Sequence, residues 1–439
     1  MSDMSASDKR SLKRMLIKDS AFMYLSNMSV TASRFLLVII LARMTGPEQF
    51  GLLQLAITAV SFVALFLDCK ADDALIRFLS EYYTTGNIAG ARTLVRLGYC
   101  MNVVLGVLCF SVVFFGAALL AQHVFHDAQG IVLVRLYAAG FAATFFDRTA
   151  LAALQSMKCF KLISLLTLAS AFIKLVLPVV CIPYGLIGIT IGYSAAHVLS
   201  ALVTIAGASV VARRQYPHSG KGTPVTDELR KIYRFVIHST ISSTFKSVMS
   251  YVDVLILGFF GSATDVGYYK FALAFTSIFG LISSPVNNVI YPTLTRLWVQ
   301  KDFVMYKKIL VKLTKYKALF LIPSAAVTVI LTPFIIRLTV GQEFMPAKYA
   351  IYIIIWAVIL VNIFSWVKSV LLSWEKPQVS AIGNFGIVCL MTALSYFFVP
   401  RWGYIGSSVT YAISYGAGII FYLIVVIRLS RSALRPPTQ

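Results

Sequence analysis

Twelve long apolar stretches alternate with short polar connections along the 439-residue chain. Each stretch is long enough for an α-helix to cross a hydrocarbon core, which takes about 20 residues. Because backbone groups in lipid must be paired within the structure itself, the stretches predict twelve transmembrane helices in an all-α polytopic membrane protein. The predicted segments are 20–43, 50–67, 97–121, 131–154, 162–182, 185–211, 235–260, 267–292, 318–340, 349–373, 377–399 and 403–427.

Positive charge falls on alternate connections. The two termini and the connections after even-numbered segments hold most of the 39 Lys and Arg residues, whereas the other connections hold only Arg43, Lys348 and Arg401. Basic loops stay on the cytoplasmic side of a membrane, so both termini are predicted to be cytoplasmic. This topology and contact with anionic lipid headgroups account for the net charge of +22, and no nucleic-acid partner is expected.

Short glycine motifs recur at about half the chain length. The sequence GPEQFG (46–51) precedes the second segment, and GSATDVG (261–267) precedes the eighth. Similarly, PYGLIG (183–188) opens the sixth segment and PRWGYIG (400–406) opens the twelfth. The offsets are nearly equal, which predicts two six-helix lobes related by a parallel repeat around a central site. The predicted parts are a cytoplasmic segment 1–19, an N-lobe 20–211, a cytoplasmic linker 212–234, a C-lobe 235–427 and a cytoplasmic tail 428–439.

Two cytoplasmic connections also correspond in the two halves. Residues 68–96 follow the second segment, and residues 293–317 follow the eighth. Both have apolar residues at helical spacing. We therefore expect a short amphipathic helix at the membrane surface in each connection.

Polar residues form stripes along four of the predicted helices. In the first segment Asn27, Thr31 and Arg34 recur at spacings of four and three, which holds one helical face. The uncharged residues could serve interhelical hydrogen bonds, but charges inside a bilayer should face protein or water and so favour a hydrated cavity. The uncharged residues expected to line it are Asn27, Thr31, Gln54, Thr58, Ser250, Ser277, Asn287 and Asn288, and the charged ones are Arg34, Lys246, Asp253 and Lys270.

Three further charges lie within predicted spans. Asp147 and Arg148 are adjacent, so they point about 100° apart on a helix and should meet partners on different helices. Lys174 lies near the middle of the fifth segment, where it could form a structural pair or contact a ligand. Both interpretations stay open from the sequence.

An excess of positive charge in a cavity selects an anionic ligand. Attraction to a phosphate is stronger where the dielectric constant is low, and Arg and Lys both bind phosphate oxygens. The residues expected to contact such a ligand are Arg34, Lys246, Lys270, Arg148 and Lys174, while Asp253 and Asp147 are expected to form charge pairs or to couple an ion.

Several loose motifs resemble one known family. They are GPEQFGL (46–52), ALIRF (74–78), YGLIG (184–188) and YPTLTRL (291–297). In this order, and with twelve spans, the chain resembles the polysaccharide-specific branch of the MOP exporter superfamily, the Wzx-type flippases.

The resemblance implies a MATE-like fold with a cavity between two lobes, lined by the first, second, seventh and eighth spans. It implies transport of an undecaprenyl-pyrophosphate-linked oligosaccharide across the bacterial inner membrane by alternating access. It also implies membrane lipids, a polymerase and other polysaccharide-assembly proteins as partners.

Other classes fit the sequence less well. A MATE-like antiporter for small cationic molecules would be expected to hold acidic groups in its cavity, and a peptidoglycan lipid flippase typically has fourteen spans. A membrane polysaccharide polymerase or ligase would need a substantial external loop, yet the longest one, 122–130, offers only His123, His126 and Asp127. No nucleotide-binding motif, metal-ligand spacing or CxxC pair occurs. We therefore expect that the protein is not an enzyme and needs no cofactor or metal.

Overall fold

A computed structural model describes residues 6–67, 71–215, 236, 247–374 and 376–433. Within these residues the protein is helical and contains no strand. Eight of the helices, or helix pairs, are long and apolar enough to cross a membrane. The described residues therefore have the structure of an all-α polytopic membrane protein.

The structure divides into two compact units. The described residues of unit 1 come from Met1–Leu37, Val63–Ala118 and Ile131–Ser243, and those of unit 2 come from Val38–Phe62, Leu119–Gly130 and Thr244–Gln439. Each unit thus draws on non-contiguous segments. The domain boundaries expected from the sequence stay a prediction.

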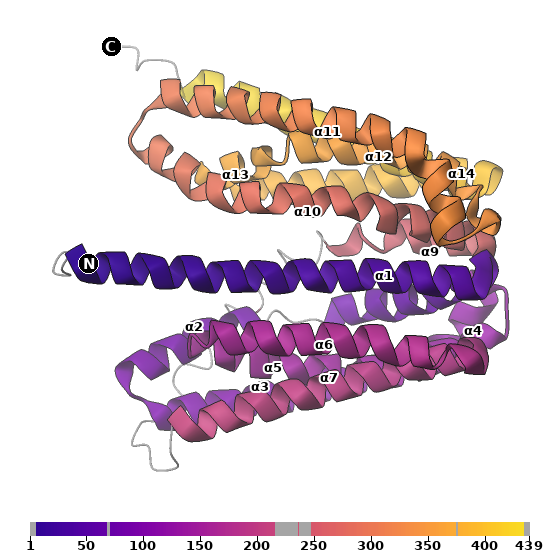
Figure 1. Ribbon diagram of the computed structural model, residues 1–439, viewed down its shortest axis with the longest axis horizontal. Helices are drawn as coiled ribbons and strands as arrows, with labels where there is room; N and C mark the ends of the chain where they lie inside the picture. The colour runs from indigo at the N-terminus through magenta and orange to yellow at the C-terminus, as the bar shows by residue number, and fades with distance from the viewer. Residues whose placement is uncertain (1–5, 68–70, 216–235, 237–246, 375, 434–439) are drawn as a thin grey trace. The chain divides into compact units, whose positions relative to one another are not determined.

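The elements up to residue 215 are helices of very different lengths (Figure 1). They are α1 (Ala6–Leu67), α2 (Ala71–Thr85), α3 (Ile88–Leu120), η1 (Ala121–Phe125), α4 (Gln129–Phe141), α5 (Thr144–Ser156), α6 (Phe160–Val180), η2 (Ile182–Tyr184) and α7 (Gly185–Gln215). The elements from residue 252 onward are α9 (Val252–Phe260), α10 (Ala263–Val299), α11 (Phe303–Thr339), η4 (Gln342–Phe344), α12 (Ala347–Ile363), α13 (Trp366–Ser373) and α14 (Pro377–Ala433).

The two longest helices each contain a glycine that breaks the helical conformation. Gly46 in α1 has φ 74°, and Gly403 in α14 has φ 51°. A positive φ is readily adopted by glycine alone, so each position allows the chain to turn between two predicted spans. Gly185, which opens α7, also has a positive φ, of 69°. Two glycines at matching places in the repeat, Gly185 and Gly403, thus share an unusual conformation.

The apolar pattern located most helices but missed two breaks. The predicted fourth segment is divided into α4 and α5 at residues 142–143, and the predicted tenth segment is divided into α12 and α13 at residues 364–365. Neither break contains proline. Most of the predicted seventh segment lies outside the described residues, apart from Val236 and the part from residue 247 onward.

A separate amphipathic helix is present in one of the two connections where it was expected and absent from the other, and its location at the membrane surface stays a prediction. Helix α2 is separate and amphipathic, with Leu75, Phe78 and Leu79 buried. Residues 293–317 form no separate helix, because α10 continues to Val299 and α11 begins at Phe303. The spans on both sides simply extend into this connection.

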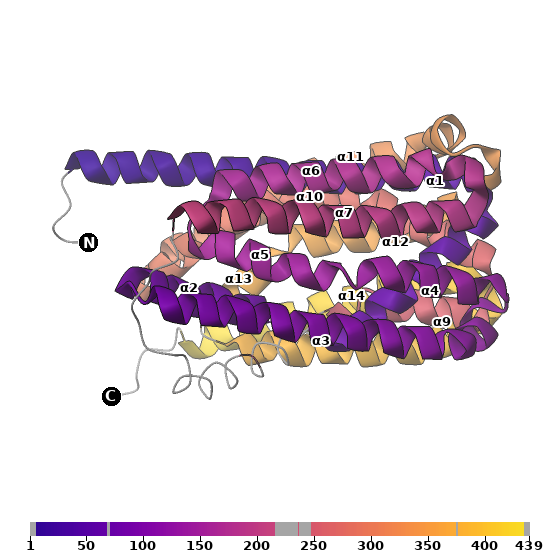
Figure 2. The same cartoon turned by 90° about the horizontal axis from the view of Figure 1, so that it is seen from below.

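Helices α5, α6 and α7 pack side by side in unit 1 (Figure 2). Gly140 of α4 lies so close to Ser194 of α7 that a Cβ on the glycine would overlap the Ser194 backbone. The Ser194 hydroxyl donates to the carbonyl oxygen of Leu136 at 2.6 Å. A small residue here allows close backbone approach, as is common between membrane helices.

Unit 2 contains a second close helix crossing. A Cβ on Gly51 of α1 would overlap the carbonyl oxygen of Ala263 in α10, and a Cβ on Gly267 of α10 would overlap that of Pro47. Nearby, Phe50 packs edge-on against Phe344, with ring centroids 6.1 Å apart. The two glycine motifs identified in the sequence are therefore packed directly against one another.

Candidate functional site

A cluster of charged side chains lies among the apolar helices of unit 1. Asp147 comes from the first turn of α5, four residues after the break at residues 142–143 that separates α4 from α5. It interacts electrostatically with Lys174 of α6 and with its neighbour Arg148. The guanidinium of Arg148 lies 5.4 Å from the centre of the Phe145 ring. All three side chains are half-buried.

Arg34 of α1 extends this cluster. It interacts electrostatically with Lys174, and both are cations, so the interaction is repulsive. The Arg34 side chain is exposed. Four residues predicted from the sequence, Arg34, Asp147, Arg148 and Lys174, are therefore brought together in one unit with three cations to one carboxylate.

The sequence prediction missed the aromatic and imidazole side chains of this cluster. Nε2 of His197 lies 3.3 Å from the hydroxyl of Tyr137, and their rings meet edge to face. His197 also interacts electrostatically with Lys174 and Arg34, and Tyr193 interacts with Arg34. Tyr193 and His197 are four residues apart, so they share one face of α7. Their four-residue spacing within the sixth apolar segment could have indicated a polar face on this helix.

A second polar cluster is buried in unit 2. Asp253 of α9 is 4% exposed, and its Oδ2 accepts a hydrogen bond of 2.6 Å from the Tyr269 hydroxyl. Its Oδ1 accepts from the backbone N–H of Val254 at 2.8 Å. Lys270 is half-buried and interacts electrostatically with the same carboxylate. Asp253 therefore has two hydrogen-bond donors and one cation as neighbours.

Two more tyrosines lie near Asp253. The rings of Tyr411 and Tyr415 in α14 have centroids 4.3 Å apart, and both side chains interact electrostatically with Asp253. Neither residue was predicted, because tyrosines in an apolar segment look like ordinary span residues. Asp253 is thus a buried carboxylate with tyrosine hydroxyls and the half-buried Lys270 as neighbours.

The remaining predicted polar residues differ in their exposure. Asn27, Ser250 and Ser277 are exposed, Thr31 is half-buried, and Gln54 and Thr58 are buried. The hydroxyls of Thr31 and Ser277 donate to carbonyls of their own helices. Lys246 lies outside the described residues, and Asn287 and Asn288 lie in α10 with side chains that are not described.

The polar loop near residue 126 has a local structural role. Nε2 of His126 lies 3.2 Å from the carbonyl oxygen of Phe259, and the Asp127 side chain accepts from the N–H of Gln129. Among the residues that the structure describes, no group of three His, Cys, Asp or Glu residues could hold a metal ion.

Comparison with known proteins relates the chain to glycan-assembly transporters. A family model described as "Polysaccharide biosynthesis protein" matches residues 16–298. The chain is 21% identical over 411 residues to a probable low-salt glycan biosynthesis flippase from Haloferax volcanii, covering 93% of this chain and 82% of the relative. It is 21% identical over 381 residues to a putative O-antigen transporter from Shigella flexneri, covering 85% of this chain and 88% of the relative.

Two solved structures share the fold. A lipid II flippase in an inward closed conformation matches with a TM-score of 0.71 and 15% identity, over 93% of this chain and 87% of that one. An inward-facing MATE-family multidrug transporter of the MOP superfamily matches with a TM-score of 0.75 and 15% identity, over 92% of this chain and 95% of that one. At this identity, the similarity establishes the fold alone.

Proposed function

Because the chain belongs to the polysaccharide biosynthesis protein family, we propose that it is a flippase for lipid-linked oligosaccharides. The substrate in this proposal is an undecaprenyl-pyrophosphate-linked repeat unit of O-antigen, capsule or exopolysaccharide. The headgroup passes through the protein by alternating access while the polyprenyl tail stays in the bilayer. The names of the relatives from Haloferax volcanii and Shigella flexneri, a glycan flippase and an O-antigen transporter, support this proposal.

The charged cluster of unit 1 carries the proposal. Lys174 and Arg148 interact with the carboxylate of Asp147, and Arg34 interacts with Lys174. Among the described residues of this cluster, three cations thus accompany one carboxylate, which leaves an excess of positive charge among apolar helices. A pyrophosphate diester carries about two negative charges at neutral pH, which is the excess that the cluster leaves. Charge-assisted hydrogen bonds to phosphate are among the strongest in proteins and strengthen further where water is scarce.

The aromatic residues of the cluster suit a sugar headgroup. The half-buried rings of Tyr193 and His197 pack on the buried ring of Tyr137 and lie beside the cations. Amphipathic rings of this kind combine apolar contact with a polar atom for hydrogen bonding. We therefore assign them to the oligosaccharide side of the headgroup.

The architecture proposed for this function is twelve spans in two six-helix lobes related by a parallel repeat. The shared positive φ of Gly185 and Gly403 supports it, as do the breaks in the predicted fourth and tenth segments. The proposal also places the protein in the bacterial inner membrane with both termini cytoplasmic, and gives it a polymerase as an assembly partner. Single cysteines placed near residues 127 and 222 test the topology, since only the former should react with an external thiol reagent.

A MATE-like antiporter is the main alternative, because the fold is shared with such a transporter. A carrier of cationic drugs needs a net negative site. The described cluster of unit 1 has three basic residues and one acidic residue, which argues for an anionic substrate.

Single substitutions in the cluster test the assignment. Lys174→Ala and Arg34→Ala should each reduce polymer export in cells that depend on this protein, by about tenfold or more, since a hydrogen bond to a charged group contributes roughly 1.5–3 kcal/mol. Protein abundance in the membrane is measured in parallel. The matched control for Lys174 is Lys161→Ala, which removes an exposed lysine from the same helix, α6.

Arg401→Ala is the control for Arg34, because Arg401 is exposed and lies outside the cluster. Full export by both cluster variants at normal abundance would contradict the site. Export of cationic dyes by the wild-type protein, lost in Asp147→Asn, would support the antiporter instead.

A further inference from the structure

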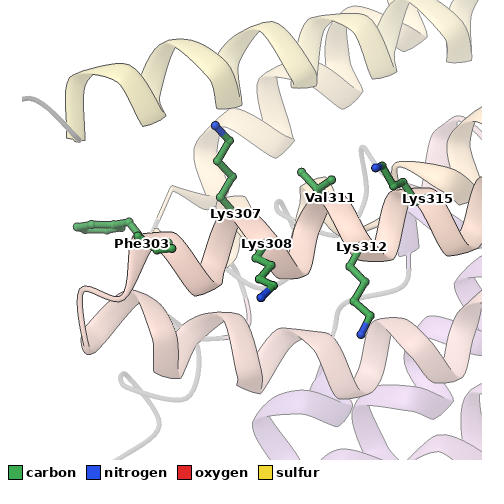
Figure 3. A pocket seen from close by; sticks show the side chains of 7 residues that line it. Phe303, Lys307, Lys308, Val311, Lys312 and Lys315 are labelled. Atoms are coloured by element: carbon green, nitrogen blue, oxygen red, sulfur yellow. The ribbon is translucent and has the colours of Figure 1, made fainter.

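A basic groove runs along the first part of α11 in unit 2. It has a volume of about 720 Å³ and is lined by Phe303, Val304, Lys307, Lys308, Val311, Lys312 and Lys315. Figure 3 shows Lys307 and Lys315 extending to one side of the helix and Lys308 and Lys312 to the other. The four lysines are exposed, and Val304 is 82% exposed. The groove therefore combines ammonium groups with uncovered apolar surface.

Unit 1 contains a smaller basic groove. It has a volume of about 210 Å³ and is lined mainly by α3, where Arg92 and Arg96 alternate with Ile88 and Val95. Residues of α5 and α7, including Ala153 and Ser209, complete its walls. No carboxylate lines either groove in the part of the chain that the structure describes.

The two grooves occupy equivalent positions in the two halves of the sequence. Six lining residues of α3 correspond to six of α11 with one constant separation of 216 residues. The pairs are Ile88 and Val304, Ala91 and Lys307, Arg92 and Lys308, Val95 and Val311, Arg96 and Lys312, and Tyr99 and Lys315. The same separation relates Gly51 to Gly267. Two basic and two apolar positions are thus retained in both halves.

The location of the grooves identifies the kind of ligand. Both lie in connections that the charge distribution assigns to the cytoplasmic side, and both helices continue into apolar candidate membrane spans. The grooves are therefore expected at the level of the lipid headgroups. Basic residues at this depth attract anionic lipids, and the long lysine stems can lie along apolar surface.

We propose that these two grooves bind anionic phospholipids from the cytoplasmic leaflet, with the phosphate on the basic residues and an acyl chain on the apolar ones. Lys308 and Lys312 are the principal contacts in the α11 groove, and Arg92 and Arg96 are their counterparts in the α3 groove. The α11 groove is the stronger site, because Lys307 and Lys315 replace the uncharged Ala91 and Tyr99. The four principal contacts are not residues of the proposed transport cluster, although Tyr99 of the α3 groove interacts electrostatically with Asp147.

The test measures binding of fluorescent phosphatidylglycerol and fluorescent phosphatidylcholine to the detergent-solubilised full-length protein. We expect phosphatidylglycerol to bind at least tenfold more tightly than phosphatidylcholine. Added salt should weaken the binding of phosphatidylglycerol. The double variant Lys308→Gln with Lys312→Gln should weaken it by about fivefold for each charge removed. Arg92→Gln with Arg96→Gln should produce a smaller loss, and Lys308→Arg with Lys312→Arg should retain binding.

The matched control is Lys161→Gln with Lys376→Gln, which removes two exposed lysines outside both grooves. An equal loss in this control would overturn the proposal, since only the overall charge would then matter. Equal binding of the two lipids would also overturn it. Displacement of phosphatidylglycerol by inorganic pyrophosphate at low concentration would instead assign the α11 groove to the pyrophosphate of the transported lipid.

Discussion

Gly51 and Gly267 lie at the crossing of α1 and α10, where each glycine faces a backbone carbonyl of the opposite helix. The carbonyls belong to Ala263 and Pro47, which are themselves 216 residues apart, like the two glycines. The crossing is therefore symmetric with respect to the sequence repeat. It leaves no room for a side chain on either helix.

Alanine at either glycine should destabilise this crossing. The added methyl group of Gly51→Ala or Gly267→Ala overlaps a carbonyl that cannot rotate away, and overpacking of this kind costs about 1–3 kcal/mol. The expected result is a lower melting temperature of the purified protein. Gly416→Ala is the control, because a Cβ there meets no atom within 4 Å. An unchanged melting temperature in both crossing variants would show that the helices separate freely.

Lys317 of α11 should be needed for the break between α12 and α13. Its ammonium donates to Ser365 Oγ at 2.7 Å and to the carbonyl oxygen of Asn362 at 3.2 Å. Lys317→Met removes these donors from a buried position, and unsatisfied buried polar groups cost about 1–3 kcal/mol. Thermal unfolding measures the effect. Arg337→Met removes an exposed cation from the same helix, outside the groove, and should unfold as the wild type does.

The hydroxyl of Tyr269 should stabilise the buried Asp253. Tyr269→Phe deletes the donor of the 2.6 Å hydrogen bond, and a hydrogen bond to a charged group contributes roughly 1.5–3 kcal/mol. A double-mutant cycle with Asp253→Asn separates this pair from other effects. Tyr268→Phe serves as the neighbouring control. Additive losses in the cycle would mean that the two side chains act independently.

Alanine should be tolerated better at Gly185 than at Gly403. Both glycines have positive φ, so alanine incurs about 1–2 kcal/mol of backbone strain at each. At Gly403 the Cβ would also lie 2.8 Å from Oδ1 of Asp265, whereas at Gly185 it meets no atom within 4 Å. Gly403→Ala should therefore lower the melting temperature further than Gly185→Ala. Equal decreases in melting temperature for the two variants would mean that backbone strain alone, and no contact with Asp265, accounts for the destabilisation.

The sequence predicted two kinds of feature: the helices that place their backbone in lipid, and the charged residues that lie within those helices. Apolar length located most helices because a span must reach across the hydrocarbon core. Charge in an apolar segment identified Arg34, Asp147, Arg148 and Lys174 because such residues need partners. Their grouping in unit 1 depends on tertiary packing and was not determined by spacing along one helix.

Other features had no local signal. The breaks at residues 142–143 and 364–365 contain neither proline nor glycine, and the second break is stabilised by Lys317 from another helix. Tyr193 and His197 are compatible with an apolar span, so their contribution to the cluster emerged only from contacts with α4 and α6.

The contact between Gly140 and Ser194 restricts how α4 and α7 can move. Because only a residue without a Cβ fits beside the Ser194 backbone, axial sliding by one helical turn would bring Leu136 or Tyr137 into that space. The two helices must therefore translate together or separate completely. Tyr193 and His197, which flank Ser194, keep a fixed distance from α4 during any motion that preserves this contact.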